Sequence, residues 1–166
     1  MAIIKWHSTM FKVSTYFIKG QIPGVAKSEI IKLYKRELEG QSVNNISTDA
    51  GTISFKNNTF RFVLNRFANK FSSFSEGQIK VVDEEDKFGV YFEAKLANLF
   101  TTAGLIAAIA ILFSIFSNGF NIFSLIVGLV IFILLIIVGF ISINISFPVY
   151  FTNLRNNIER EVQAVV

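Results

Sequence analysis

The sequence has 166 residues, 52% of them apolar, with 16 Lys and Arg against 12 Asp and Glu and no cysteine. This length suits one domain of ordinary size plus a small additional segment, so a second full domain is not expected. The missing cysteine excludes disulfides, thiolate nucleophiles and cysteine-ligated metals, and the net charge of +4 is too small to indicate a nucleic-acid partner.

The first 40 residues predict one strand and one helix. Apolar and polar residues alternate over residues 11–18, with the period of a half-buried strand. After a turn marked by Pro23 we expect a helix over residues 28–40, with Ser28 as N-cap and Gly40 as terminator. One face of this helix carries the apolar residues Ile30, Ile31, Tyr34 and Leu38.

Two hairpins are predicted next. TISFK (52–56) and TFRFVLN (59–65) flank an Asn-Asn pair, which tolerates the left-handed conformations of a tight turn. GQIKVVD (77–83) and KFGVYFEAKL (87–96) flank an acidic turn in the same way. Residues 1–95 are therefore expected to form an α+β domain, with a small antiparallel sheet of four to five strands and one helix on one of its faces.

Residues 60–74, FRFVLNRFANKFSSF, interleave five phenylalanines with three basic residues. The second half has helical spacing, with Phe67, Phe71 and Phe74 at i, i+4 and i+7. Two interpretations remain open: a connector whose phenylalanines fill the core, or a surface that rests on the inner leaflet or on a protein partner. The candidate residues of that surface are Arg66, Phe67, Lys70 and Phe71. No RNA-binding motif accompanies these aromatic residues.

A membrane hairpin is predicted after residue 95. Residues 96–154 form a run of 59 without Asp, Glu, Lys or Arg, longer than a soluble core element requires. The cluster SNGFN (117–121) is a turn signal that divides the run into spans of about 20 residues each, 97–116 and 122–142. We expect both spans to be helices, because in a bilayer each segment must satisfy its own backbone hydrogen bonds, and we assign residues 96–147 to the hairpin.

The basic residues predict the orientation of this hairpin. The connection 117–121 has none, whereas Lys87, Lys95, Arg155 and Arg160 flank the spans, so both termini are expected in the cytoplasm. The abundance of Ile, Phe, Lys and Asn is compatible with an AT-rich bacterial genome. The expected location is therefore the bacterial inner membrane.

The spans hold no ionisable residue, which argues against a transporter, proton relay or channel. They do hold small residues at four-residue spacing, as in helices that pack closely. The pairs are Ala103 with Ala107, Gly104 with Ala108, and Ser124 with Gly128. Such faces would close the hairpin on itself or join it to other subunits.

The tail, residues 148–166, is expected to be a short amphipathic helix. Pro148 should end or bend the second span, and apolar residues at Phe151, Leu154, Ile158 and Val162 then share one helical face. The tail would lie on the membrane surface, on the sheet domain or on a partner.

No enzymatic chemistry, cofactor or metal site is predicted. His7 is the only histidine, so no Cys/His dyad or multi-histidine metal site can be assembled. The four carboxylates of DEED (83–86) are contiguous, whereas a calcium loop distributes its ligands over about a dozen residues.

The sequence thus favours a non-enzymatic integral membrane protein whose cytoplasmic domain is held at the inner leaflet to bind a protein partner or lipid headgroups. The alternative is a structural or accessory subunit of a membrane complex, or a homo-oligomer, assembled through the hairpin.

Overall fold

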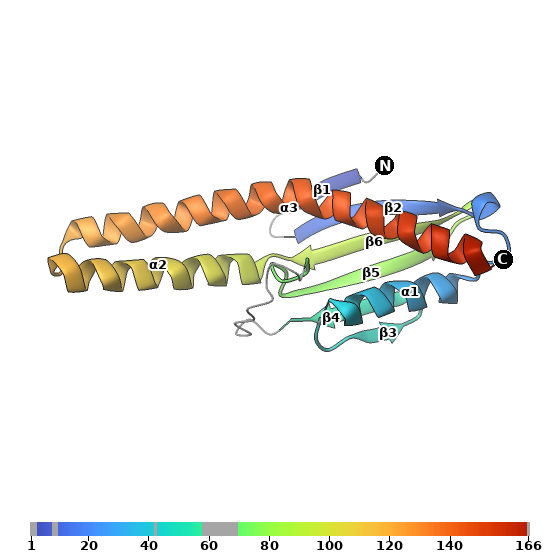
Figure 1. The fold of residues 1–166 in the computed structure, drawn as a ribbon, viewed down its shortest axis with the longest axis horizontal. Helices are drawn as coiled ribbons and strands as arrows, with labels where there is room; N and C mark the ends of the chain where they lie inside the picture. The colour runs from blue at the N-terminus through green and yellow to red at the C-terminus, as the bar shows by residue number, and fades with distance from the viewer. Residues whose placement is uncertain (1–2, 8–9, 42, 58–69, 166) are drawn as a thin grey trace.

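The computed structural model describes residues 3–7, 10–41, 43–57 and 70–165, and it has the α+β fold expected from the sequence (Figure 1). The strands are β1 (Ile3–His7), β2 (Met10–Ile18), β3 (Ser47–Asp49), β4 (Thr52–Lys56), β5 (Glu76–Asp83) and β6 (Lys87–Lys95). The α-helices are α1 (Lys27–Gly40), α2 (Ala97–Asn118) and α3 (Ile122–Val165), and a short 3-10 helix spans Lys19–Gln21. The six described strands form one antiparallel sheet in the order β1-β2-β6-β5-β4-β3.

The strands run along the same axis as the two long helices, and the hairpin of α2 and α3 projects beyond one end of the sheet (Figure 1). Helix α1 packs against β4 and β5, and the second half of α3 packs against β2. Both helices lie on the same face of the sheet (Figure 1). We call this the core face and the opposite one the open face.

The predicted hairpin of β5 and β6 is confirmed. These strands pair from Glu76–Lys95 to Asp83–Phe88, and the Glu84 amide donates to the Lys87 carbonyl at 2.9 Å to close the turn. The predicted strand 59–65 lies outside the described residues. Strand β4 is paired on both edges, by β3 and β5.

Helix α1 begins earlier than predicted. Its N-cap is Ala26, and the Ala26 amide donates to the carboxylate of Glu29 at 3.1 Å. Ser28 therefore lies inside the first turn, so its assignment as N-cap was wrong. Glu29 places a negative charge in this first turn, where it both satisfies a free amide and interacts favourably with the helix dipole.

Helix α3 is the largest departure from the sequence-based expectation. It runs without interruption through Pro148, so the expected short C-terminal helix is its second half. A proline inside a helix costs about 3 kcal/mol because it cannot donate to the preceding turn. Here the flanking residues compensate: Phe147 and Phe151 are 4% and 0% exposed and pack into the core.

The core is a cluster of aromatic rings contributed by segments far apart in the chain. The Phe147 ring on α3 lies 4.7 Å from Phe92 on β6 and 5.4 Å from Phe11 on β2, measured between centroids. The same ring lies 5.0 Å from Phe74, which precedes β5. Helix α3 therefore completes the core of the sheet domain, and that domain is not built from residues 1–95 alone.

Two buried asparagines hold the turn that carries Phe71 and Phe74 into this core. The side-chain amide of Asn57 donates to the carbonyls of Phe71 and Phe74, each at 3.1 Å. Asn98, in the first turn of α2, donates to the Phe74 carbonyl at 2.9 Å. The junction between sheet and hairpin is thus closed by hydrogen bonds that satisfy buried backbone carbonyls.

Candidate functional site

Helices α2 and α3 are each long and apolar enough to cross a membrane. Their outward faces carry exposed large apolar residues along both helices, among them Leu112, Phe116, Phe123, Leu134 and Val138. On a protein in water such a surface would be unfavourable, whereas lipid chains solvate it.

Small residues close the hairpin. Ala103, Ala107 and Ser124 are buried between the two helices. A Cβ added at Gly128 would overlap Cγ1 of Ile111, so the absence of a side chain lets α2 approach. At the tip, the Ser114 hydroxyl donates to the Ser124 hydroxyl at 3.0 Å, and the Ser124 amide donates to Oδ1 of Asn121 at 3.0 Å.

The other predicted packing residues lie differently. Ala108 is exposed, and Gly104 is half-buried with no heavy atom closer than 3.9 Å to a Cβ added there. Ala103, Ala107, Ser124 and Gly128 thus pack within the hairpin, whereas Ala108 faces outward.

The predicted surface at residues 66–71 is only partly described. Arg66 and Phe67 lie outside the described residues. Lys70 is exposed, and its backbone amide donates to Oε1 of Gln41 at 3.2 Å. Phe71 is 0% exposed, with its ring 5.5 Å from that of Phe147. Its assignment to a membrane or partner surface was wrong, because the turn before β5 directs it inward.

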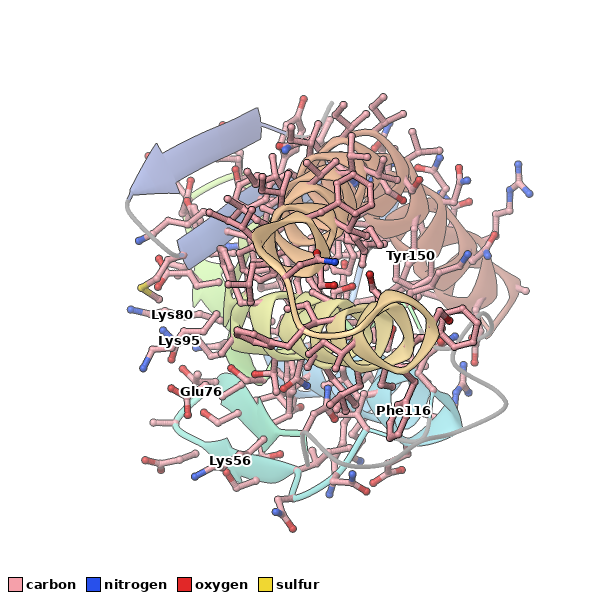
Figure 2. All side chains as sticks on the ribbon, turned by 90° about the vertical axis from the view of Figure 1, so that its left-hand side faces the viewer. Lys56, Glu76, Lys80, Lys95, Phe116 and Tyr150 are labelled. Atoms are coloured by element: carbon pink, nitrogen blue, oxygen red, sulfur yellow. The ribbon has the colours of Figure 1, made fainter. Side chains whose placement is uncertain are left out.

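The open face of the sheet is a more extensive candidate surface than residues 66–71. Its residues alternate along β2, β6, β5 and β4 with those of the core, and no described helix covers it. In Figure 2, viewed from the hairpin end, Lys56, Glu76, Lys80 and Lys95 point to one side, away from the helices. The strand register arranges the open face in rows that run across the sheet. From the hairpin outward, the first three rows are Met10-Lys95-Glu76-Lys56, Lys12-Glu93-Gln78-Ser54 and Ser14-Tyr91-Lys80-Thr52.

Ion pairs connect neighbouring strands in the two rows nearest the hairpin. Lys95 contacts Glu76 at 2.5 Å, and Lys12 contacts Glu93 at 2.6 Å. The hydrogen bond from Lys12 holds the pKa of Glu93 below its usual range, and the bond from Lys95 does the same for the pKa of Glu76. Both carboxylates are therefore ionised at neutral pH.

The middle of the open face carries exposed tyrosines. Tyr16 and Tyr91 are 44% and 41% exposed. The Tyr91 hydroxyl donates to Glu84 at 3.0 Å, and its ring leans over Gly89, where an added Cβ would lie 2.9 Å from Cε2 of Tyr91. Tyr91 is thus held in one orientation while it remains accessible, which is the character of a contact residue.

Lys56 and Lys80 leave the open face with unneutralised positive charge. Neither has a salt bridge among the described residues, in contrast to Lys12, Lys87 and Lys95. Lys80 stands beside Tyr91 in the third row.

A groove lies on the helical side of the domain. It is a groove of about 520 Å³ between the start of α1 and the end of α3. Its lining is mostly apolar, with carboxylates from Glu29 and Glu161 and the ammonium of Lys32. Glu161 also forms a bidentate pair with Arg36, which joins α3 to α1 at this groove.

The acidic turn holds ordinary ion pairs. Asp83 pairs with Lys19 at 2.7 Å, and Glu84 pairs with Lys87 at 3.3 Å. These carboxylates face different neighbours, and no group of three or more metal-ligating side chains occurs within the part of the chain that the structure describes.

No family model, curated protein or solved structure matches the chain. Sequence reasoning did not single out the open face, although the alternation in 11–18 and 87–95 contained the signal. Its lysines and glutamates have the composition of any solvated face, and only the strand order shows that they lie together.

Proposed function

We propose that this chain is a non-enzymatic integral membrane protein that holds a protein-binding sheet at the cytoplasmic surface of a membrane, with the open face as the binding surface. The observation that carries the proposal is the orientation of that face. Its strands run along the hairpin axis (Figure 1), so in a hairpin that crosses the bilayer along this axis the face would stand perpendicular to the membrane plane and point sideways.

This orientation favours a protein partner over lipid headgroups. Strand β6 leads directly into α2, so the first row lies next to the membrane. Lys80 lies four residues further along its strand than Glu76, a rise of about 13 Å at roughly 3.3 Å per residue. That distance exceeds the Debye length of about 8 Å at physiological ionic strength, so headgroup charges are largely screened at the third row.

Photo-cross-linking in cells tests this function. A photoreactive phenylalanine analogue placed at Lys80 should give a protein adduct of defined mass, because the face would be occupied. The same analogue at Lys32, exposed on α1, is the matched control and should give none. A result in which Lys80 yields no discrete protein adduct, or no more than Lys32, would contradict the proposal.

The second candidate, a subunit assembled through the hairpin, rests on Ala108 and Gly104. Contacts within the hairpin do not bury Ala108, and Gly104 is only half-buried, with a Cβ added there no closer than 3.9 Å to Phe132, so a neighbouring helix could approach α2 there. A defined larger assembly recovered in mild detergent, carrying other chains and lost on Ala108→Leu, would favour this candidate.

A further inference from the structure

We infer that the partner for which the open face is built is a second copy of this chain, related by a two-fold axis that runs parallel to the strands between β5 and β6. This inference rests on the proposed function, since it names the occupant of the same face. Its basis is membrane symmetry together with the chemistry of the rows.

The membrane restricts the symmetry. Two copies inserted in the same orientation can be related only by rotation about an axis along the membrane normal, because any other two-fold would invert one copy. Closed two-fold pairs are the commonest homo-oligomers, and each uses the same patch twice. Because the strands run along the hairpin axis (Figure 1), this rotation turns the open faces of the two copies toward each other. Each row keeps its distance from the membrane, so it meets the same row of the second copy.

The strand order places this axis at the centre of the sheet. In the order β1-β2-β6-β5-β4-β3 the midline falls between β6 and β5. Rotation about that midline sets β6 of one copy opposite β5 of the other. An axis lying on β6 or on β5 would instead bring Lys95, or Lys80, opposite its own equivalent, with repulsion between like charges.

The facing residues of β5 and β6 are complementary in the three rows nearest the membrane. In the first row Lys95 meets Glu76 of the second copy and Glu76 meets Lys95, giving a square of alternating charge. In the second row Glu93 meets Gln78, an acceptor opposite an amide donor. In the third row Lys80, which has no salt bridge among the described residues, meets the oriented ring of Tyr91, a cation–π arrangement.

The area of the face is adequate for a dimer. The six described strands hold 39 residues, and at about 4.8 Å by 3.3 Å each they give a face of roughly 620 Å². Stable specific interfaces bury about 600–1,000 Å² on each partner. The tyrosines lie near the middle of this face and the first charged row lies at its margin, which is the usual arrangement of a specific interface.

Cysteine cross-linking tests the dimer directly, because the chain contains no native cysteine. Gln78→Cys lies beside the proposed axis, whereas Lys32→Cys lies on α1, on the far side of the sheet. With a short bismaleimide applied to the full-length protein in native membranes, Gln78→Cys should give the dimer band in at least about tenfold greater yield, because paired cysteines react as if at millimolar concentration. Equal yields from the two positions would overturn the inference.

Charge exchange tests the position of the axis. In the Gln78→Cys background, Glu76→Lys and Lys95→Glu should each lower the dimer yield, since each makes the first row a cluster of like charge. Co-expression of the two variants with tags of different size should restore cross-linking as the mixed dimer. If the single variants cross-link as well as the parent, or the mixed species does not exceed either homodimer, the axis between β5 and β6 is wrong.

The cross-linking yield of Gln78→Cys without a charge change decides whether the dimer exists, even if a charge variant fails to accumulate. Failure of the dimer is also distinguishable from failure of the proposed function. An adduct of Lys80 to a different protein would keep the open face as a binding surface and reject the second copy.

Discussion

At the residue scale, glycines in the hairpin have unequal roles that their sequence spacing does not distinguish. Gly128 receives the side chain of Ile111, while a Cβ added at Gly104 would meet only Phe132, at an ordinary contact distance of 3.9 Å. Gly128→Ala should therefore destabilise the protein by about 1–3 kcal/mol through overpacking. Gly104→Ala should be neutral or stabilising, because alanine is the better helix former by about 1 kcal/mol. Thermal unfolding followed by circular dichroism in one detergent compares the two variants with the parent.

The Gly104 variant is the matched control for helix propensity and for detergent effects. Equal midpoints for the two alanine variants would show that Ile111 rotates away at little cost, and that close approach at Gly128 does not hold the hairpin together.

At the element scale, the second half of α3 belongs to the sheet domain. It supplies Phe147, Phe151 and Ile158 to the core, each at most 4% exposed. Residues 1–95 expressed alone should therefore lack a cooperative unfolding transition, since the aromatic cluster would lie open to water. Near-ultraviolet circular dichroism and heat denaturation would show this loss.

A matched fusion protein isolates the cause. Residues 1–95 joined by a flexible linker to residues 143–165 should recover a cooperative transition, because the missing face of the core is restored without the spans. A cooperative transition in 1–95 alone would mean that α1 and the sheet suffice, and that α3 only rests on them.

At the scale of the whole molecule, α3 joins the two parts as one rod of about 66 Å, at 1.5 Å per residue over its 44 residues. A hairpin that tilts in a bilayer would therefore tilt the sheet with it. Fourteen of the 16 Lys and Arg lie in residues 1–95 and none lies between residues 96 and 154, so the sheet is expected on the cytoplasmic side.

Labelling of intact cells tests this orientation. A membrane-impermeant maleimide should modify Ser117→Cys, at the exposed tip of the hairpin, before permeabilisation, and Lys32→Cys only after it. The reverse pattern would place the sheet outside the cytoplasm and would refute the orientation, whatever the open face binds.

The sequence by itself determined the hairpin and the class of the domain. A run of 59 residues without Asp, Glu, Lys or Arg is long enough for two membrane spans, and period-two alternation beside one amphipathic segment is typical of a sheet with a helix on one face. These are local signals, because each depends on residues a few positions apart.

Only the tertiary structure decided which elements share a core and which face remains open. Phe71 had the same helical spacing as a surface aromatic, and Pro148 carried the signal of a helix end. The burial of Phe71 and the continuation of α3 through Pro148 depend on contacts between residues far apart in the chain. Phe71 and Phe92 pack against Phe147, and Phe151 packs against Tyr34. Burial of those rings outweighs the local preferences, and the strand order that gathers Lys80, Tyr91 and Glu93 on one open surface follows from the same long-range packing.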